Sequence, residues 1–332
     1  MDELKEKNNV NDQDKSEVEN QNFSTDKNID PDNDVDYQIP PVGAAFLGLI
    51  GGFFLYQIIG ALLTVLIFGL DLESVPVNGL RLMTMAGQIL FILLPALVFT
   101  KWIYSDIGKI IRIRKTTWQE LGLFTLGILI LTPLLQSFLY IQNYFLEIWA
   151  KNSEFINSVK TFFDTLNQLV EKTYGNLLSA SNIFELILVL MVVAIVPALA
   201  EETMFRGFVQ RSFELKLKPY IAIFLTALFF SAYHFNPYGF IPLFILGSFF
   251  GFAAYKSKTL IIPMVLHFLN NFSAVVLYYI IGDDELLKSD VSVNSTDLTS
   301  YFTMLVVLTL LFVFLIYFIN KYYTRKFSIQ EI

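Results

Sequence analysis

Long apolar stretches dominate this sequence and leave few folds open to it. Six blocks are almost free of charged side chains: 41–70, 119–146, 183–200, 219–255, 259–281 and 302–319. An apolar stretch of about 18 or more residues with few charges is typical of a membrane-spanning helix. Only 16% of all residues are charged, whereas soluble domains average about 25%. The sequence therefore predicts an all-α, polytopic membrane helix bundle.

The charges between the apolar blocks predict the topology. We expect about eight transmembrane helices, at 42–70, 80–102, 119–146, 182–216, 218–236, 239–256, 259–281 and 299–321. Lys and Arg are enriched in cytoplasmic loops, and with eight spans all the basic segments fall on one side: 101–115, 211–218, 256–258 and 321–326. The loops on the other side are acidic or neutral. We therefore expect a multi-pass protein of the cell membrane with both termini cytoplasmic.

The two ends of the chain lie outside the expected membrane domain, 41–322. Residues 1–40 hold twelve acidic and four basic residues, a net charge of −8. The whole chain has a net charge of −7, so the remainder is close to neutral. Such a polar segment buries too little apolar surface to fold, so 1–40 is expected to be a disordered acidic tail. Residues 323–332 are expected to form a short cytoplasmic tail. The chain has no cysteine, which excludes disulfides and thiolate metal sites.

Two further patterns concern packing and the outer surface. The loop at 151–181 has amphipathic spacing, which predicts a helix at the outer interface or capping the bundle, with a substrate gate as the alternative. Its apolar positions are Phe155, Val159, Phe162, Phe163, Leu166 and Val170. Two pairs of glycines, Gly48 with Gly52 and Gly247 with Gly251, are typical of closely packed membrane helices.

A pair of acidic residues lies inside the expected fourth span. Glu201 and Glu202 are the only charged residues between Leu186 and Phe205. A charge inside a span costs about 2.5–3.5 kcal/mol on insertion scales and indicates function. Arg206 follows Glu202 by four residues, so these two can pair on one helical face and are interpreted as structural. Glu201 is rotated by about 100° and needs another partner, as a general base would.

The only two histidines of the chain, His234 and His267, are expected in later spans. His267 and Asn271 are one turn apart on the same face of a helix. Glu201 and His234 are equally distant in sequence from the turn at 217–219, so a helical hairpin would bring them to one height. One histidine alone could be a hydrogen-bonded core residue. Both of them next to the acidic pair indicate a shared site around a water molecule or an ion.

Three ordered motifs resemble those of the CPBP family. That family comprises CAAX-type prenyl-protein endopeptidases of the Rce1 type and bacteriocin-processing or Abi relatives. The resemblance covers roughly residues 185–280, the expected catalytic core. The motifs are Glu201-Glu202-x-x-x-Arg206, Phe230-x-x-x-His234 and His267-x-x-x-Asn271, and Leu243-x-x-x-Gly247 is similar to a further family element.

The resemblance implies an intramembrane endopeptidase, a hydrolase that cuts a membrane-associated protein or peptide. Glu201, with His234, would activate a water molecule to attack a peptide carbonyl. His267 and Asn271 would stabilise the oxyanion that develops. The expected partners are this substrate and the lipid bilayer, without any nucleic acid. The residues expected to hold the local structure are Glu202, Arg206 and Phe230.

A metal-dependent version and two other classes of function stay open at this point. Glu201, His234 and His267 could instead bind one divalent ion, zinc, because two His and one carboxylate leave a position for water. No His-Glu-x-x-His or Gly-x-Ser-x-Gly motif is present, which disfavours other protease types. The alternatives are a non-catalytic membrane scaffold or regulator and a proton-coupled transporter with Glu201 in a relay.

Overall fold

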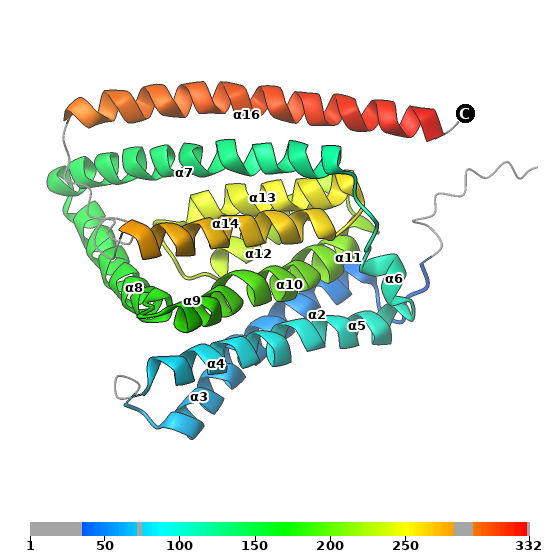
Figure 1. Ribbon diagram of the computed structural model, residues 1–332, viewed down its shortest axis with the longest axis horizontal. Coiled ribbons are helices and arrows are strands. Elements are labelled where there is room, and N and C mark those ends of the chain that lie inside the picture. The colour runs from blue at the N-terminus through cyan, green and yellow to red at the C-terminus, as the bar shows by residue number, and fades with distance from the viewer. Residues whose placement is uncertain (1–34, 72–74, 282–294, 331–332) are drawn as a thin grey trace, which may run out of the picture. The chain divides into compact units, whose positions relative to one another are not determined.

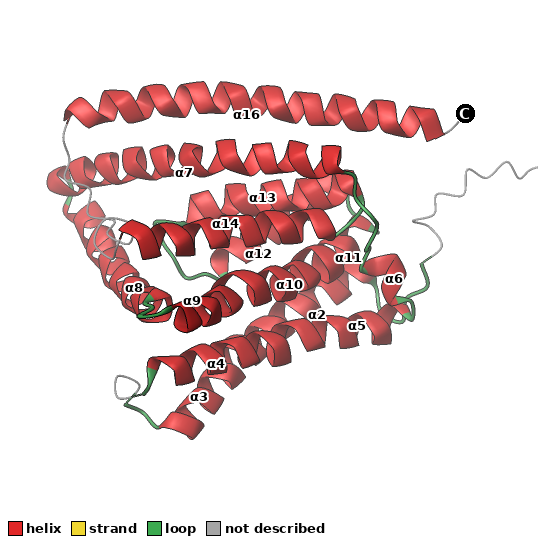
Figure 2. Cartoon of the chain, viewed as in Figure 1, coloured by secondary structure: helices red, strands yellow, loops and turns green. Residues whose placement is uncertain are grey.

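The computed structural model describes residues 35–71, 75–281 and 295–330, and within these ranges the only regular elements are helices (Figure 2). Seven of the described helices are long and apolar enough to cross a membrane. The predicted all-α, polytopic helix bundle is confirmed. Most of the predicted acidic tail, residues 1–34, lies outside the described residues, as do the acidic loop residues of 282–294.

The N-terminal half of the chain forms three long helices, two of which contain a π-helical segment. The first consists of α2 (Pro41–Phe53), the π-helical segment η1 (Phe54–Gly60) and α3 (Ala61–Phe68). The second consists of α4 (Val77–Gln88), the π-helical η3 (Ile89–Leu93) and α5 (Leu94–Tyr104). The short α6 (Ile107–Ile110) leads into the third, α7 (Trp118–Asn152), after which α8 (Glu154–Leu178) fills the region of the predicted amphipathic helix.

The C-terminal half holds the segment with the buried charges. The fourth long helix runs through α9 (Ile183–Leu190), η4 (Met191–Ile195), α10 (Val196–Glu202), η5 (Thr203–Val209) and α11 (Gln210–Glu214). It is followed by α12 (Pro219–Ala232), α13 (Phe240–Ser257), α14 (Ile261–Ile281) and α16 (Ser295–Gln330). In Figure 1, α16 lies along α7, and α13 and α14 lie between α7 and α10.

The predicted fifth span, 218–236, is only partly helical. Its helix α12 has 14 residues, or about 21 Å, which is shorter than the roughly 30 Å of a bilayer core. His234, expected inside this span, lies in the turn that follows. Three local features end the helix. Phe235 has a left-handed φ of 48°, Asn236 Oδ1 accepts a 2.8 Å hydrogen bond from Gly239 N, and Pro237 disfavours a helical residue before it.

The C-terminal helix also differs from the expected division at residue 322. Helix α16 continues to Gln330, so most of the predicted tail 323–332 extends the helix. Its last turns are held by Glu120 of α7, whose side chain is 0% exposed. Glu120 Oε1 accepts from Tyr323 Oη at 2.9 Å, Lys326 Nζ at 2.8 Å and Arg114 Nη2 at 2.8 Å. A buried carboxylate requires such donors.

The predicted close packing at the glycine pairs is confirmed. A Cβ atom at Gly48 would lie 2.5 Å from Phe208 Cε1, and one at Gly52 would overlap Met204 Cε. Real Cβ atoms do not come this close to other carbons. Helix α2 can therefore pack directly against η5 because these two positions carry no side chain.

Gly247→Ala is expected to destabilise the protein by about 1–3 kcal/mol through overpacking. The added Cβ would lie 2.9 Å from Phe230 Cδ1 and 3.3 Å from Arg206 Nη2, and Gly251 is equally enclosed. Thermal unfolding in detergent measures the effect. Gly122→Ala on α7 is the matched control, because a Cβ there meets nothing within 4 Å and should leave stability equal or slightly higher. Equal melting temperatures for the two variants would contradict tight packing at Gly247.

Candidate active site

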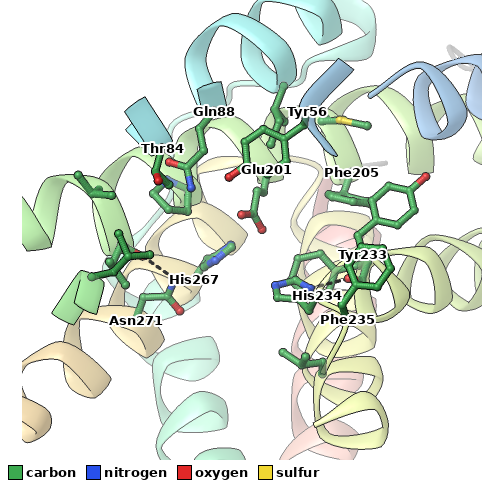
Figure 3. A pocket seen from close by; sticks show the side chains of 18 of the residues that line it. Tyr56, Thr84, Gln88, Glu201, Phe205, Tyr233, His234, Phe235, His267 and Asn271 are labelled. Atoms are coloured by element: carbon green, nitrogen blue, oxygen red, sulfur yellow. Dashed lines mark hydrogen bonds between the residues drawn. The ribbon is translucent and has the colours of Figure 1, made fainter. Parts of the chain in front are cut away.

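The four residues predicted to be catalytic line one cavity of about 610 Å³ (Figure 3). They come from three separate parts of the chain. Glu201 belongs to α10, His234 to the turn after α12, and His267 and Asn271 to α14. Helix α10 contacts α14 directly, and α12 contacts η5, which continues α10, and α13, which contacts α14.

Glu201 presents an unpartnered carboxylate to this cavity. Figure 3 shows the carboxylate pointing into the space between His267 and His234. Among the described residues, its Oε2 atom is buried and has no hydrogen-bond partner. The next residue, Glu202, is fully buried and points elsewhere. The carboxylate of Glu201 is therefore available to a bound water or substrate.

Glu202 joins two cationic or potentially cationic groups. Its Oε1 atom accepts from Arg206 Nη1 at 2.8 Å, so the predicted ion pair is present. The same oxygen is 2.7 Å from His267 Nδ1, a contact that the sequence did not predict. Arg206 also donates through Nη2 to Gly247 O at 3.0 Å. Glu202 thus orients the His267 ring and compensates the positive charge of Arg206.

Phe230 contacts two residues of the site, Arg206 through its ring and His234 through its carbonyl oxygen. The Arg206 guanidinium lies 4.4 Å from the centroid of the Phe230 ring, a distance typical of cation–π contacts. The Phe230 carbonyl oxygen is 2.7 Å from His234 Nδ1. Because a carbonyl only accepts, Nδ1 must carry the hydrogen, and in a neutral ring Nε2 is then an acceptor. His234 can therefore accept a proton from water at Nε2.

The Asn271 side chain is already partly engaged. Its Nδ2 atom donates to Val193 O at 2.8 Å. Pro197, four residues after Val193, has no N–H to offer that carbonyl, so Asn271 supplies a donor there. Asn271 Oδ1 accepts from Asn270 Nδ2 at 3.1 Å. An amide nitrogen carries two hydrogens, so one N–H is left for a ligand in the cavity.

The trio proposed for the metal-dependent version does not form a ligand set as it lies. Among the residues that the structure describes, no three His, Asp or Glu side chains are close enough to hold one ion. The Nδ1 atoms of His234 and His267 face protein acceptors. Their Nε2 atoms are therefore the ring nitrogens that remain for a ligand shared with Glu201.

Several residues that support the site were not singled out from the sequence. Gln57 Nε2 donates to Tyr233 O at 3.3 Å, and Tyr233 Oη donates to Leu49 O at 2.7 Å. Gln142 Nε2 donates to Tyr238 O at 3.0 Å. These bonds hold the turn that carries His234 against α2, η1 and α7. The sequence shows these side chains only as isolated polar residues in apolar segments. It does not reveal which groups they bond to.

Helix α8 closes one side of the cavity. The helix predicted within 151–181 is confirmed, and its C-terminal half lines the cavity with Leu169, Val170, Thr173, Leu177 and Leu178. Its middle is bonded to the turn after α12, because Tyr238 Oη donates to Asp164. Lys160 Nζ lies 2.9 Å from Asp164 Oδ2. Partial burial lowers the pKa of Lys160, but the nearby carboxylates of Asp164 and Glu147 outweigh it and raise that pKa above its usual value.

The comparison with known families concerns the segment that builds this cavity. Residues 183–273 match the model of the Rce1-like family, described as type II CAAX prenyl endopeptidase Rce1-like. We call residues 183–273 the Rce1-like segment. The match confirms the resemblance predicted from the motifs and supports an intramembrane protease. No curated protein and no solved structure matches the chain.

The Rce1-like segment contains all the residues on which the resemblance was based. It begins at α9 and ends within α14, close to the core predicted at 185–280. Glu201, His234, His267 and Asn271 all lie inside it. With the long apolar helices on both sides, it forms part of a multi-pass membrane protein whose environment is lipid.

Proposed function

We propose that this protein is an intramembrane endopeptidase that hydrolyses a peptide bond of a membrane-associated protein or peptide. The observation that carries the proposal is the unpartnered Glu201 carboxylate, which points between two imidazole rings in a cavity. An isolated carboxylate in an apolar helix is costly, and a general base is a role that requires it. The Rce1-like match over the same segment supports this reading.

The proposed reaction begins with a water molecule between Glu201 and Nε2 of His234. Glu201 takes a proton from the water, and the water oxygen bonds to the carbonyl carbon of the substrate. This step gives a tetrahedral oxyanion. His267, protonated at Nε2, and the remaining N–H of Asn271 donate to this oxyanion. When the C–N bond breaks, the proton passes from Glu201 to the leaving amine. Water is consumed, and one acid and one amine are formed.

Glu202, Arg206 and Phe230 act as positioning residues in this proposal. Glu202 holds His267 through the 2.7 Å contact at Nδ1, which leaves Nε2 directed away from it. The opposite charges of Glu202 and Arg206 cancel through their 2.8 Å ion pair. A neutral pair suits a site enclosed by apolar helices, where an uncompensated charge is costly.

The location of the protein is part of the same proposal. The basic segments that flank the helices favour a cell-membrane protein with both termini in the cytoplasm. The substrate would reach the cavity from the bilayer or from its surface. Opening of α8, which lines one side of the cavity, would admit it.

Comparative proteomics of membranes with the wild-type protein and with Glu201→Ala tests the proposed function. Precursors should accumulate in the variant, and the new N-termini that the wild type generates should be missing. Identical sets of N-termini would overturn the proposal. A scaffold would tolerate Glu201→Ala, whereas a transporter would lose proton flux without any change in N-termini, so both alternatives are distinguished.

The metal-free mechanism makes a separate prediction. Cleavage by the purified protein should continue, within about twofold, after exhaustive treatment with a strong chelator, because the proposed proton transfers need only side chains and water. Elemental analysis of the same sample should find no stoichiometric metal. Loss of activity that is restored by adding zinc would replace the glutamate mechanism with the zinc version at Glu201, His234 and His267.

A further inference from the structure

A second unpartnered oxygen lies in the catalytic cavity, on a helix outside the Rce1-like segment. Gln88, the last residue of α4, lines the cavity and is 7% exposed. Among the described residues, its Oε1 atom is buried without a hydrogen-bond partner. Of the buried side-chain oxygens without partners in 35–71, 75–281 and 295–330, Gln88 Oε1 and Glu201 Oε2 are the two that line this cavity.

The position of Gln88 is unusual for a glutamine in an apolar helix. Amide side chains inside membrane helices normally donate or accept across a helix interface. Here Figure 3 shows Gln88 and Thr84, one turn earlier on α4, extending into the cavity from one side, while His267 and Asn271 enter from α14. The Glu201 carboxylate lines the same cavity. Burial of an unpaired amide destabilises the fold, which a bound molecule would offset.

A peptide has the chemistry that matches this amide. In a cavity that excludes water, each backbone N–H and C=O of the substrate needs a partner, since an unpaired group is costly in an apolar environment. Whichever way the Gln88 amide is turned, it offers one acceptor and one donor side by side. An extended peptide offers the complementary N–H and C=O groups.

We infer that Gln88 binds the backbone of the substrate peptide. The inference rests on the proposed endopeptidase function and names a substrate-binding residue for it. The role concerns the peptide backbone rather than a side chain, so it does not depend on which sequence is cleaved. Gln88 touches the substrate but takes no part in proton transfer.

Kinetics on a defined peptide test the role of Gln88. The probe is a peptide obtained by incubating the purified wild-type protein with a digest of membrane proteins and selecting one that wild type cuts and Glu201→Gln does not. With this peptide, Gln88→Leu should raise KM roughly five- to tenfold, the effect of one lost hydrogen bond, with kcat within about twofold. The melting temperature should stay equal or rise, because the variant buries no unpaired amide.

Backbone-modified peptides identify the contact. A series in which each amide near the scissile bond is replaced by an ester removes one N–H at a time. At one position the ester should raise KM severalfold for the wild type and leave it unchanged for Gln88→Leu, a coupling expected only if the two groups touch. Gln136→Leu on α7 is the matched control, because Gln136 is exposed and outside the cavity lining.

The outcomes separate this inference from the proposed function. If every peptide that the wild type cuts is also cut by Glu201→Gln, both the proposed function and the role of Gln88 are overturned. Cleavage by the wild type with an unchanged KM for Gln88→Leu overturns only the role of Gln88. A fall in melting temperature for Gln88→Leu without an ester-dependent coupling would assign Gln88 to helix packing instead.

Discussion

Glu201→Gln is expected to lower the rate of peptide cleavage by about 10²–10⁴-fold, the range typical of a lost general base. Glutamine has nearly the same shape as glutamate but cannot take a proton from water. The side chain lies in the cavity with Oε2 unpartnered among the described residues, so the substitution breaks no hydrogen bond at that atom. Helix content, melting temperature and membrane insertion should therefore stay unchanged. Turnover of a peptide cut by the wild type, measured in detergent, gives the rate.

His234→Ala and the double variant extend this prediction. If Glu201 and His234 act on the same water, removal of either one should cost nearly as much as removal of both, because residues that act as a unit are not additive. If the two residues act independently, the fold-loss in rate of the double variant should instead equal the product of the two single losses. Glu185→Gln is the matched control: it lies in the same long helix, and its side chain accepts from Ser181 N at 2.9 Å near the helix start, away from the cavity lining. Full activity of Glu201→Gln would remove Glu201 as the base.

The sequence was most informative about the helices and about which residues share the site. Blocks of apolar residues located most ends of the long helices within a few residues, because crossing a bilayer imposes length and composition directly. Helices α7 and α16 continue further than predicted. The cost of charge inside a span singled out Glu201 and Glu202, and the scarcity of histidine did the same for His234 and His267. The motif order then identified the family over the segment 183–273.

What the sequence could not predict depends on contacts between distant segments. The early end of α12 follows from Phe235, Asn236 and Pro237 acting together, whereas hydropathy continues through them. The bond between Glu202 and His267 joins residues 65 positions apart, and no periodicity reports such a contact. The unpartnered amide of Gln88 is likewise invisible in a sequence, because any other glutamine in a membrane helix would be expected to find a partner.

Arg206→Met is expected to cause the largest loss of stability, about 3–5 kcal/mol, because it leaves a buried carboxylate without its cation. Arg206 is 0% exposed and bonds to Glu202 Oε1 at 2.8 Å and Gly247 O at 3.0 Å. Its loss should lower both the yield of membrane-inserted protein and the melting temperature in detergent. Arg325→Met, at an exposed position of α16, is the control and should change stability by no more than about 0.5 kcal/mol.

A second substitution distinguishes a stranded charge from lost packing. In the double variant Glu202→Gln with Arg206→Met, the carboxylate that Arg206→Met leaves without its cation is removed as well, so part of the lost stability should return. Activity should not return with it, because glutamine cannot balance a protonated His267 and the ring would lose the carboxylate that orients it. Recovery of stability without recovery of cleavage would separate the two roles of Glu202. A double variant that is no more stable than Arg206→Met would show instead that the packing of the guanidinium against Phe230 is the dominant contribution.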